Sequence, residues 1–224
     1  MSRIELALSP RNHVTFNAQH QALVLSPDRL APGVAEALRG RGLRLVAAGR
    51  PSEADRGWFA EVLPRRPDRL TGWLGHFQAW LSVQGEEEDL GVFSARKDNV
   101  WDWVIDASEA RWFAEEVAPP GYLHLPGGDL TDELERQLAG AADGDIRHPV
   151  YIQYRAERCA HSSKGVEGCS LCLEGCPAGA LRSENGVIGV QAELCHGCGL
   201  CASRCPTGAI RYDYPSLNGV LTAC

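Results

Sequence analysis

The chain has 224 residues, of which 22 are Lys or Arg and 29 are Asp or Glu, and its formal net charge is −7. A nucleic-acid partner would call for a basic patch or stripe, and this acidic balance argues against one. The length allows one domain or two, because a domain commonly holds roughly 100–200 residues.

The positions of the cysteines predict two domains. Eight of the nine lie between Cys159 and Cys205, the ninth is Cys224, and residues 1–145 contain none. We therefore expect an α+β protein in which a mixed α/β domain, residues 1–145, precedes a cysteine-rich domain, residues 146–224. The cysteine-rich domain carries seven basic and six acidic side chains, so the remainder carries 15 and 23, a net charge of −8.

The same distribution indicates the compartment. A secreted disulfide framework would spread paired cysteines through the whole chain. The N-terminal sequence MSRIELALSPRNHVTF has charges and a proline where a signal peptide needs an apolar stretch. No run approaches the ~18 apolar residues of a membrane span. We expect a cytoplasmic protein with no membrane span.

Residues 22–49 have the pattern of a β-α-β unit. Its parts are a strand at Ala22–Ser26, a helix with Leu30, Val34 and Leu38 on one face, and a strand at Leu43–Gly49. Such a unit raises the alternative of a dinucleotide site and hence of an enzyme. However, the strand-to-helix turn SPDRLAPG lacks the G-x-G-x-x-G glycines that let backbone approach a pyrophosphate.

Further along, two apolar runs flank the acidic residues 86–89, which predicts a hairpin with the charges at its solvated tip. A strand is expected at Val100–Ser108, then a short helix ending at Pro119-Pro120. Small and polar residues at Ala141–Pro149 read as a linker. We find no catalytic constellation in residues 1–145 and expect this domain to serve docking.

The strongest motif is C-x2-C-x2-C-x3-C-P at Cys195–Pro206. Three closely spaced cysteines and a fourth followed by proline are the ligand pattern of bacterial iron–sulfur clusters. Zinc sites usually consist of two separated C-x2-C pairs, so zinc is the weaker interpretation. A second, incomplete copy at Cys169–Pro177 aligns with the first at a constant offset of 29 residues, and Val166 falls where the partner of Cys195 should stand.

Four alternatives exist for the missing ligand of that copy. Cys159 lies ten residues before Cys169, His161 offers an imidazole, Cys224 ends the chain, and the corner may also stay empty of protein ligand. A longer loop costs little closure entropy, because that cost rises only slowly with length. We therefore expect Cys159 to complete the copy, with its thiolate moved outward by the seven additional residues of the loop.

From Val150 to Tyr214 the chain resembles bacterial ferredoxins with two 4Fe-4S clusters, through both cysteine motifs and the paired sequences CPAGAL and CPTGAI. In that family the last cysteine of each motif crosses to the other cluster. The resemblance implies one cluster held by Cys159, Cys169, Cys172 and Cys205, and another held by Cys176, Cys195, Cys198 and Cys201. It also implies a pairing of the strand-like segments 150–155 and 209–214, and a hairpin at 181–190 with Asn185-Gly186 at its turn.

These features indicate a non-catalytic carrier that passes single electrons between redox protein partners through two 4Fe-4S clusters. A wider resemblance, based on the CxHSSxGxxGC loop behind a cysteine-free α/β region, is to the N-terminal portion of large multi-cluster proteins, some associated with formate dehydrogenase. It implies a dehydrogenase partner. The alternative is an assembly or maturation factor for a larger metal-containing oxidoreductase. The inserted AHSSKGVEG loop is our expected docking place for a partner.

Overall fold

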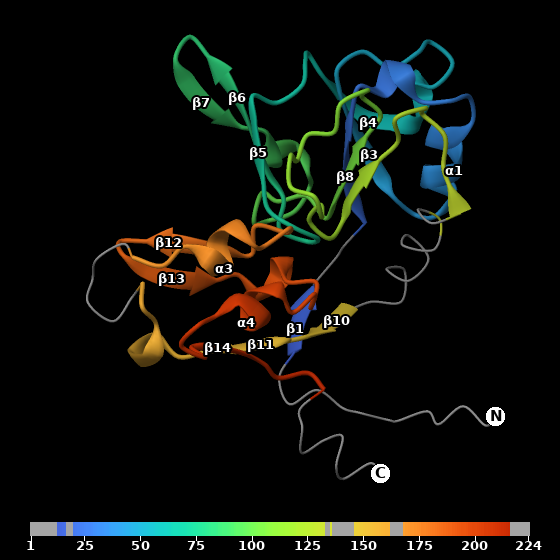
Figure 1. The fold of residues 1–224 in the computed structure, drawn as a ribbon. Coiled ribbons are helices and arrows are strands. Elements are labelled where there is room, and N and C mark those ends of the chain that lie inside the picture. The colour runs from blue at the N-terminus through green and yellow to red at the C-terminus, as the bar shows by residue number, and fades with distance from the viewer. Residues whose placement is uncertain (1–12, 17–19, 133–134, 136–145, 162–167, 216–224) are drawn as a thin grey trace, which may run out of the picture. The chain divides into compact units, whose positions relative to one another are not determined.

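The computed structural model describes residues 13–16, 20–132, 135, 146–161 and 168–215 (Figure 1). The chain divides into two compact units. The first, called here the N-terminal unit, comprises residues 16–114 and 118–146. The second, called the cysteine unit, comprises residues 1–15, 115–117 and 147–224. None of the helices in the described part of the chain is long and apolar enough to cross a membrane.

A parallel sheet of five strands forms the centre of the N-terminal unit, in the order β4-β3-β2-β8-β9. The strands are β2 (Gln21–Leu25), β3 (Arg44–Ala48), β4 (Phe59–Leu63), β8 (Trp103–Asp106) and β9 (Tyr122–His124). The short helices η1 (Pro27–Arg29), α1 (Val34–Gly40) and η2 (Arg56–Trp58) lie in the connections between β2 and β4. Strands β2, β3 and β8 are buried almost throughout, as expected for a parallel sheet covered on both faces.

The predicted β-α-β unit is confirmed, because β2 and β3 are parallel and α1 connects them. The helix begins only at Val34, and Leu30 precedes it in a separate turn. In the loop between β2 and α1, the Ala31 N–H donates to the Gly128 carbonyl oxygen at 3.0 Å. This amide therefore bonds the protein's own backbone, unlike the amides of a phosphate-binding turn.

A second sheet, β5-β6-β7, is antiparallel and packs on the first through one cluster of buried side chains. Its strands are β5 (Arg69–Thr71), β6 (Gln78–Val83) and β7 (Glu86–Asp89), and η3 (Leu90–Phe93) follows. The predicted hairpin exists, but the acidic run forms the strand β7 and not the tip. The turn is Gln84-Gly85, and both residues have positive φ (53° and 91°), as a two-residue hairpin turn favours.

The prediction of a helix between Val100–Ser108 and Pro119-Pro120 is wrong. The segment is irregular, and buried side chains bind the Trp112 N–H. The Trp112 N–H donates to the buried Asp106 carboxylate at 3.2 Å and to the Tyr122 hydroxyl oxygen at 2.7 Å. The same carboxylate accepts from the Tyr122 hydroxyl at 2.6 Å and from the Ser108 N–H at 3.1 Å. Burial and this carboxylate raise the pKa of Tyr122 far above its usual range.

The cysteine unit is built from two antiparallel strand pairs and two short helices. Strand β11 (Ile152–Tyr154) pairs with β14 (Ile210–Tyr212), which confirms the predicted pairing of the outer strands. Strand β12 (Leu181–Glu184) pairs with β13 (Val187–Val190) in the predicted hairpin. Its turn residues Asn185 and Gly186 both have positive φ (53° and 75°).

The remaining elements of this unit carry the cysteine loops. They are η4 (Ala156–Arg158), α3 (Leu171–Glu174), η5 (Ala192–Leu194) and α4 (Leu200–Arg204). A further two-stranded sheet joins β1 (His13–Phe16) to β10 (Ile146–Pro149). The predicted linker at Ala141–Pro149 therefore ends in a strand, and its first five residues lie outside the described part of the chain.

A buried ion pair stabilises the N-terminal unit beside β8. Asp102 has no exposed side-chain surface, accepts from the Gln21 N–H at 2.7 Å and pairs with Arg96, whose side chain is 8% exposed. Arg96 also pairs with Asp98, which is 48% exposed. Replacing Asp102 would remove a buried carboxylate from beside the nearly buried Arg96 guanidinium and would leave the Gln21 N–H without this acceptor.

We predict that Asp102→Ala lowers the free energy of unfolding of this unit by about 3–5 kcal/mol. Urea unfolding followed by tryptophan fluorescence measures it, since all six tryptophans lie between Trp58 and Trp112. The control Asp98→Ala removes the exposed partner of Arg96 and should cost less than about 1 kcal/mol. Equal effects of the two substitutions would contradict the importance of burial at Asp102.

Candidate metal centres

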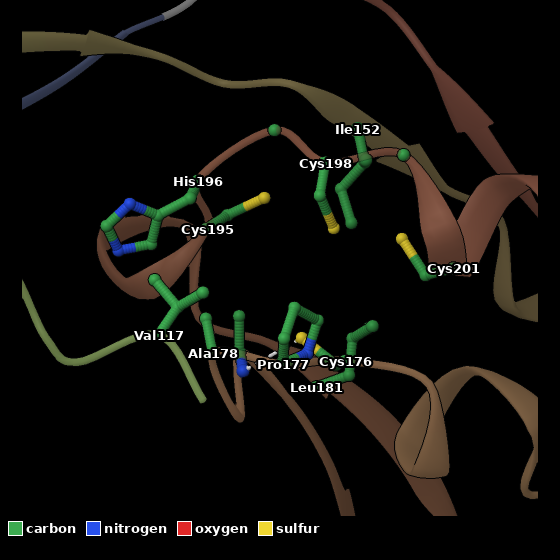
Figure 2. A pocket seen from close by; sticks show the side chains of 13 residues that line it. Val117, Ile152, Cys176, Pro177, Ala178, Leu181, Cys195, His196, Cys198 and Cys201 are labelled. Atoms are coloured by element: carbon green, nitrogen blue, oxygen red, sulfur yellow. Dashed lines mark hydrogen bonds between the residues drawn. The ribbon is translucent and has the colours of Figure 1, made fainter. Parts of the chain in front are cut away.

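Two cavities in the cysteine unit are each lined by four cysteines. The larger, of about 40 Å³, is lined by Cys176, Cys195, Cys198 and Cys201. Figure 2 shows their sulfur atoms directed toward a common space, while the ring of His196 points away from it. Apolar side chains, among them Ile152 and Leu181, complete the wall. We call this cavity the second centre.

The smaller cavity, of about 20 Å³, is the first centre. It is lined by Cys159, Cys169, Cys172 and Cys205, with Ala209 and Ile210 among its apolar neighbours. The two centres thus divide eight cysteines into two sets of four without overlap. The last cysteine of each motif, Cys176 or Cys205, lines the cavity of the other motif. This is the division that the ferredoxin resemblance implied.

The thiols of each set influence one another electrostatically. Burial raises the pKa of the Cys172 thiol, and the charges of the three other thiols of its cavity raise it as well. Burial raises the pKa of Cys201 to about 11, again with the other three thiols of its cavity acting in the same direction. Four thiolates in one apolar cavity repel each other, and a cationic metal core would remove that penalty. The donor set therefore fits a soft, multiply charged metal group.

The local backbone places Cys159 where Cys195 stands in the other half of the unit. Each cysteine follows a 3-10 turn, η4 or η5, and each N–H donates to the carbonyl oxygen three residues before it, at 3.0 Å and 3.2 Å. Their backbone angles also agree, with φ −78° and ψ 124° at Cys159 and φ −76° and ψ 117° at Cys195. Cys159 and Cys195 are 36 residues apart, whereas the other paired cysteines of the two motifs are 29 residues apart. The difference of seven equals the extra length of the loop.

Hydrogen bonds to sulfur repeat in the two halves. The Ala180 N–H donates to Cys176 Sγ at 3.3 Å. At Cys205 burial raises the pKa, but hydrogen bonds from the Ile210, Thr207 and Ala209 backbone and from the Thr207 hydroxyl group lower it overall. Such bonds favour the thiolate, which is the form that binds a metal.

Two tyrosines hold the loop of the second centre. The Tyr212 hydroxyl donates to the Gly197 carbonyl oxygen at 2.8 Å. Gly197 has a φ of 72°, and a Cβ placed on it would lie 2.5 Å from the Tyr151 ring. Only glycine fits both the conformation and the contact. Cys198 follows Gly197 in this loop and is exposed, so the second centre reaches the protein surface.

His161, one of the alternative ligands, is buried with 4% of its surface exposed. Its Nδ1 lies 3.0 Å from the Cys169 carbonyl oxygen, and its Nε2 lies 2.7 Å from the Ser183 hydroxyl oxygen. Both ring nitrogens therefore have partners within the protein. Cys224, the other alternative, and residues 162–167 of the inserted loop lie outside the described part of the chain.

The side chains that hold the cysteine loops could not be identified from the sequence. Ser183 and Tyr212 stand in strands, and nothing in their spacing indicates contact with His161 or Gly197. Val117 also lines the second centre, and its N–H donates to the Pro177 carbonyl oxygen at 2.9 Å. A pattern of spaced cysteines predicts ligands, but contacts of this kind depend on how strands far apart in sequence are brought together.

Among the described residues, no three His, Cys, Asp or Glu side chains converge closely enough to hold a single metal ion. Instead, the four cysteines of each centre line a cavity.

Comparison with known proteins identifies one family in this unit. The 4Fe-4S binding domain family (Fer4) matches residues 188–211, which contain Cys195, Cys198, Cys201 and Cys205. No curated protein matches the chain. The chain therefore contains a ferredoxin-type 4Fe-4S binding segment at residues 188–211.

Proposed function

We propose that the cysteine unit binds two 4Fe-4S clusters, one in each centre. The observation that carries this proposal is the division of eight cysteines into two cavities of four. Four thiolates are the usual ligand set of such a cluster, and the crossing of Cys176 and Cys205 is the arrangement of two-cluster ferredoxins. Only the second motif lies within the segment matched to the 4Fe-4S family, so the first centre is the part that experiment must test most directly.

Cys159 is the fourth ligand of the first centre in this proposal. Its backbone geometry matches that of Cys195, and its side chain lines the same cavity as Cys169 and Cys172. His161 is a poor ligand by comparison. A carbonyl oxygen only accepts hydrogen bonds, so the His161 Nδ1–H group donates a hydrogen bond to the Cys169 carbonyl oxygen. In the neutral ring, Nε2 then accepts a hydrogen bond from the Ser183 hydroxyl group. Neither nitrogen then has a free lone pair for iron.

We propose further that the protein is a single-electron carrier. A bound 4Fe-4S cluster supplies a one-electron couple whose potential depends on hydrogen bonds to sulfur and on exposure to solvent. The residues of this chain set both quantities. Amide groups such as that of Ala180 donate to sulfur, and apolar residues such as Ile152 exclude water. Exposed Cys198 gives the second centre a surface at which a redox partner can dock.

The partner we propose is a cytoplasmic redox protein, and a formate-dehydrogenase-type oxidoreductase is the specific candidate. Two bound clusters with a net charge of about −2 each would make the cysteine unit anionic. A basic docking patch on the partner would then be attracted to it. In this proposal the N-terminal unit, with its acidic strand β7, contributes docking and carries out no chemistry.

Cys159→Ala tests the ligand set. The wild-type chain, purified without oxygen, should hold about eight irons and the variant about seven, with an EPR signal of the 3Fe type. This follows because the iron atom bound by Cys159 would lose its only cysteine ligand. Cys224→Ala is the matched control and should leave about eight irons. If the spectrum of the Cys159 variant were unchanged while Cys224→Ala or His161→Ala lost iron, the assignment of Cys159 would be wrong.

Redox cycling tests the carrier role. The oxidised chain should take up about two electrons from a chemical reductant, one for each cluster. It should then return them to an oxidised viologen dye over repeated cycles with its iron content unchanged. The assembly-factor alternative predicts another result. In that case iron and sulfide would leave the chain and appear in an added apo-enzyme, and cycling would not conserve them.

A further inference from the structure

We propose that His161 is a positioning residue for the first centre, holding the Cys169 loop in place from outside the ligand set. This inference deepens the proposed function and depends on it, because a positioning role requires a metal group to be positioned. His161 is not assigned as a ligand here. It acts through the backbone of one.

The first step of the argument is the bond to Cys169. Cys169 is followed by the helix α3, which carries Cys172, so the position of its carbonyl group fixes where the loop enters the helix. His161 Nδ1 donates to this carbonyl oxygen at 3.0 Å. His161 is 4% exposed, so little water can reach its ring to replace the bond if it is lost.

The second step is the bond to Ser183. Ser183 lies in β12, which pairs with β13 in register and forms a fixed part of the unit. The Ser183 hydroxyl group lies 2.7 Å from His161 Nε2. The imidazole therefore bridges the cysteine loop and a paired strand, with one nitrogen on each. Anchoring of this kind orients ligands and is a recognised contribution of groups around a metal site.

The third step concerns the length of the loop. His161 and Cys169 are separated by seven residues, and their hydrogen bond closes this part of the chain on itself. This hydrogen bond ties Cys169 to His161, which stands two residues after Cys159, and so links the chain close to both cysteines. The first centre can therefore have an arrangement of cysteines like that of the second centre, although Cys159 and Cys169 are more widely spaced in sequence.

The second centre has a different side chain supporting its loop, one residue away from the equivalent position. There the Tyr212 hydroxyl donates to the Gly197 carbonyl oxygen at 2.8 Å, and Tyr212 is 42% exposed. Aligned at the 29-residue offset, Gly197 corresponds to Gly168, one residue before Cys169. The two loops therefore have non-equivalent supports, one buried and one exposed. Substitutions at the two supports should affect different centres.

The test uses the full chain loaded with iron and sulfide and compares His161→Leu with His161→Asn. Leucine fills a similar volume without a hydrogen bond, whereas the asparagine amide can donate from near the position of Nδ1. Ferricyanide takes one electron while one iron leaves as Fe²⁺, which converts a 4Fe cluster with charge +2 into a 3Fe cluster with charge +1. The rate of this conversion is followed by EPR. The spectra of Cys159→Ala and Cys198→Ala, each lacking one ligand of one centre, show which signal belongs to which centre.

We expect His161→Leu to lose iron from the first centre roughly tenfold faster than wild type, as changes around metal ligands commonly do. His161→Asn should restore most of the wild-type rate. Ser183→Ala should have a smaller effect on the same centre and serves if the leucine variant fails to fold. The control Tyr212→Phe should leave the first centre at the wild-type rate.

Equal rates in wild type, His161→Leu and Ser183→Ala would overturn the proposal. So would equal acceleration at both centres, or a failure of asparagine to restore the rate, because either result indicates a general loss of structure. The proposed function fails in a different way. If the wild-type chain holds about four irons or none, the two-cluster assignment is wrong before any variant is compared.

Discussion

Everything in the cysteine unit depends on bringing four thiols together in an apolar cavity against their mutual repulsion. Burial and neighbouring charge both raise the pKa of Cys172 and of Cys201, so these thiols resist ionisation. The backbone holds them together, and a bound cationic metal group would compensate their charge. Two antiparallel strand pairs and the short helices α3 and α4 provide that frame. Hydrogen bonds to the cysteine loops and to sulfur also hold the thiols in place.

The frame is nearly symmetric, but the symmetry is not exact. The elements η4 and η5, α3 and α4, and β12 and β14 correspond at offsets of 36 or 29 residues. The side chains around them differ, with buried His161 near one loop and exposed Tyr212 near the other. If each centre holds a 4Fe-4S cluster as proposed, the two clusters should differ in reduction potential, because that potential depends on hydrogen bonds to sulfur and on exposure to solvent. In the proposed carrier, such a difference would make one cluster the favoured site of the transferred electron.

The sequence predicted the parts of this protein that follow from local pattern. Strands β2 and β3, the outer pair β11-β14 and the Asn185-Gly186 turn follow from apolar runs, turn dipeptides and the ferredoxin motif. The prediction failed where side chains distant in sequence determine the backbone. The Asp106 carboxylate takes the Trp112 N–H that a helix would have used, and the Gln84-Gly85 turn moves the acidic residues into a strand. No local periodicity encodes either contact.

The crossing of Cys176 and Cys205 has a consequence for how such a unit can be made. Each half of the sequence supplies three thiols to one cavity and one to the other, so neither half contains a complete set of four. Cutting the unit between β12 and β13 would leave two fragments that each lack a ligand. If each cavity holds a cluster as proposed, binding of either cluster would therefore require both halves to be folded together.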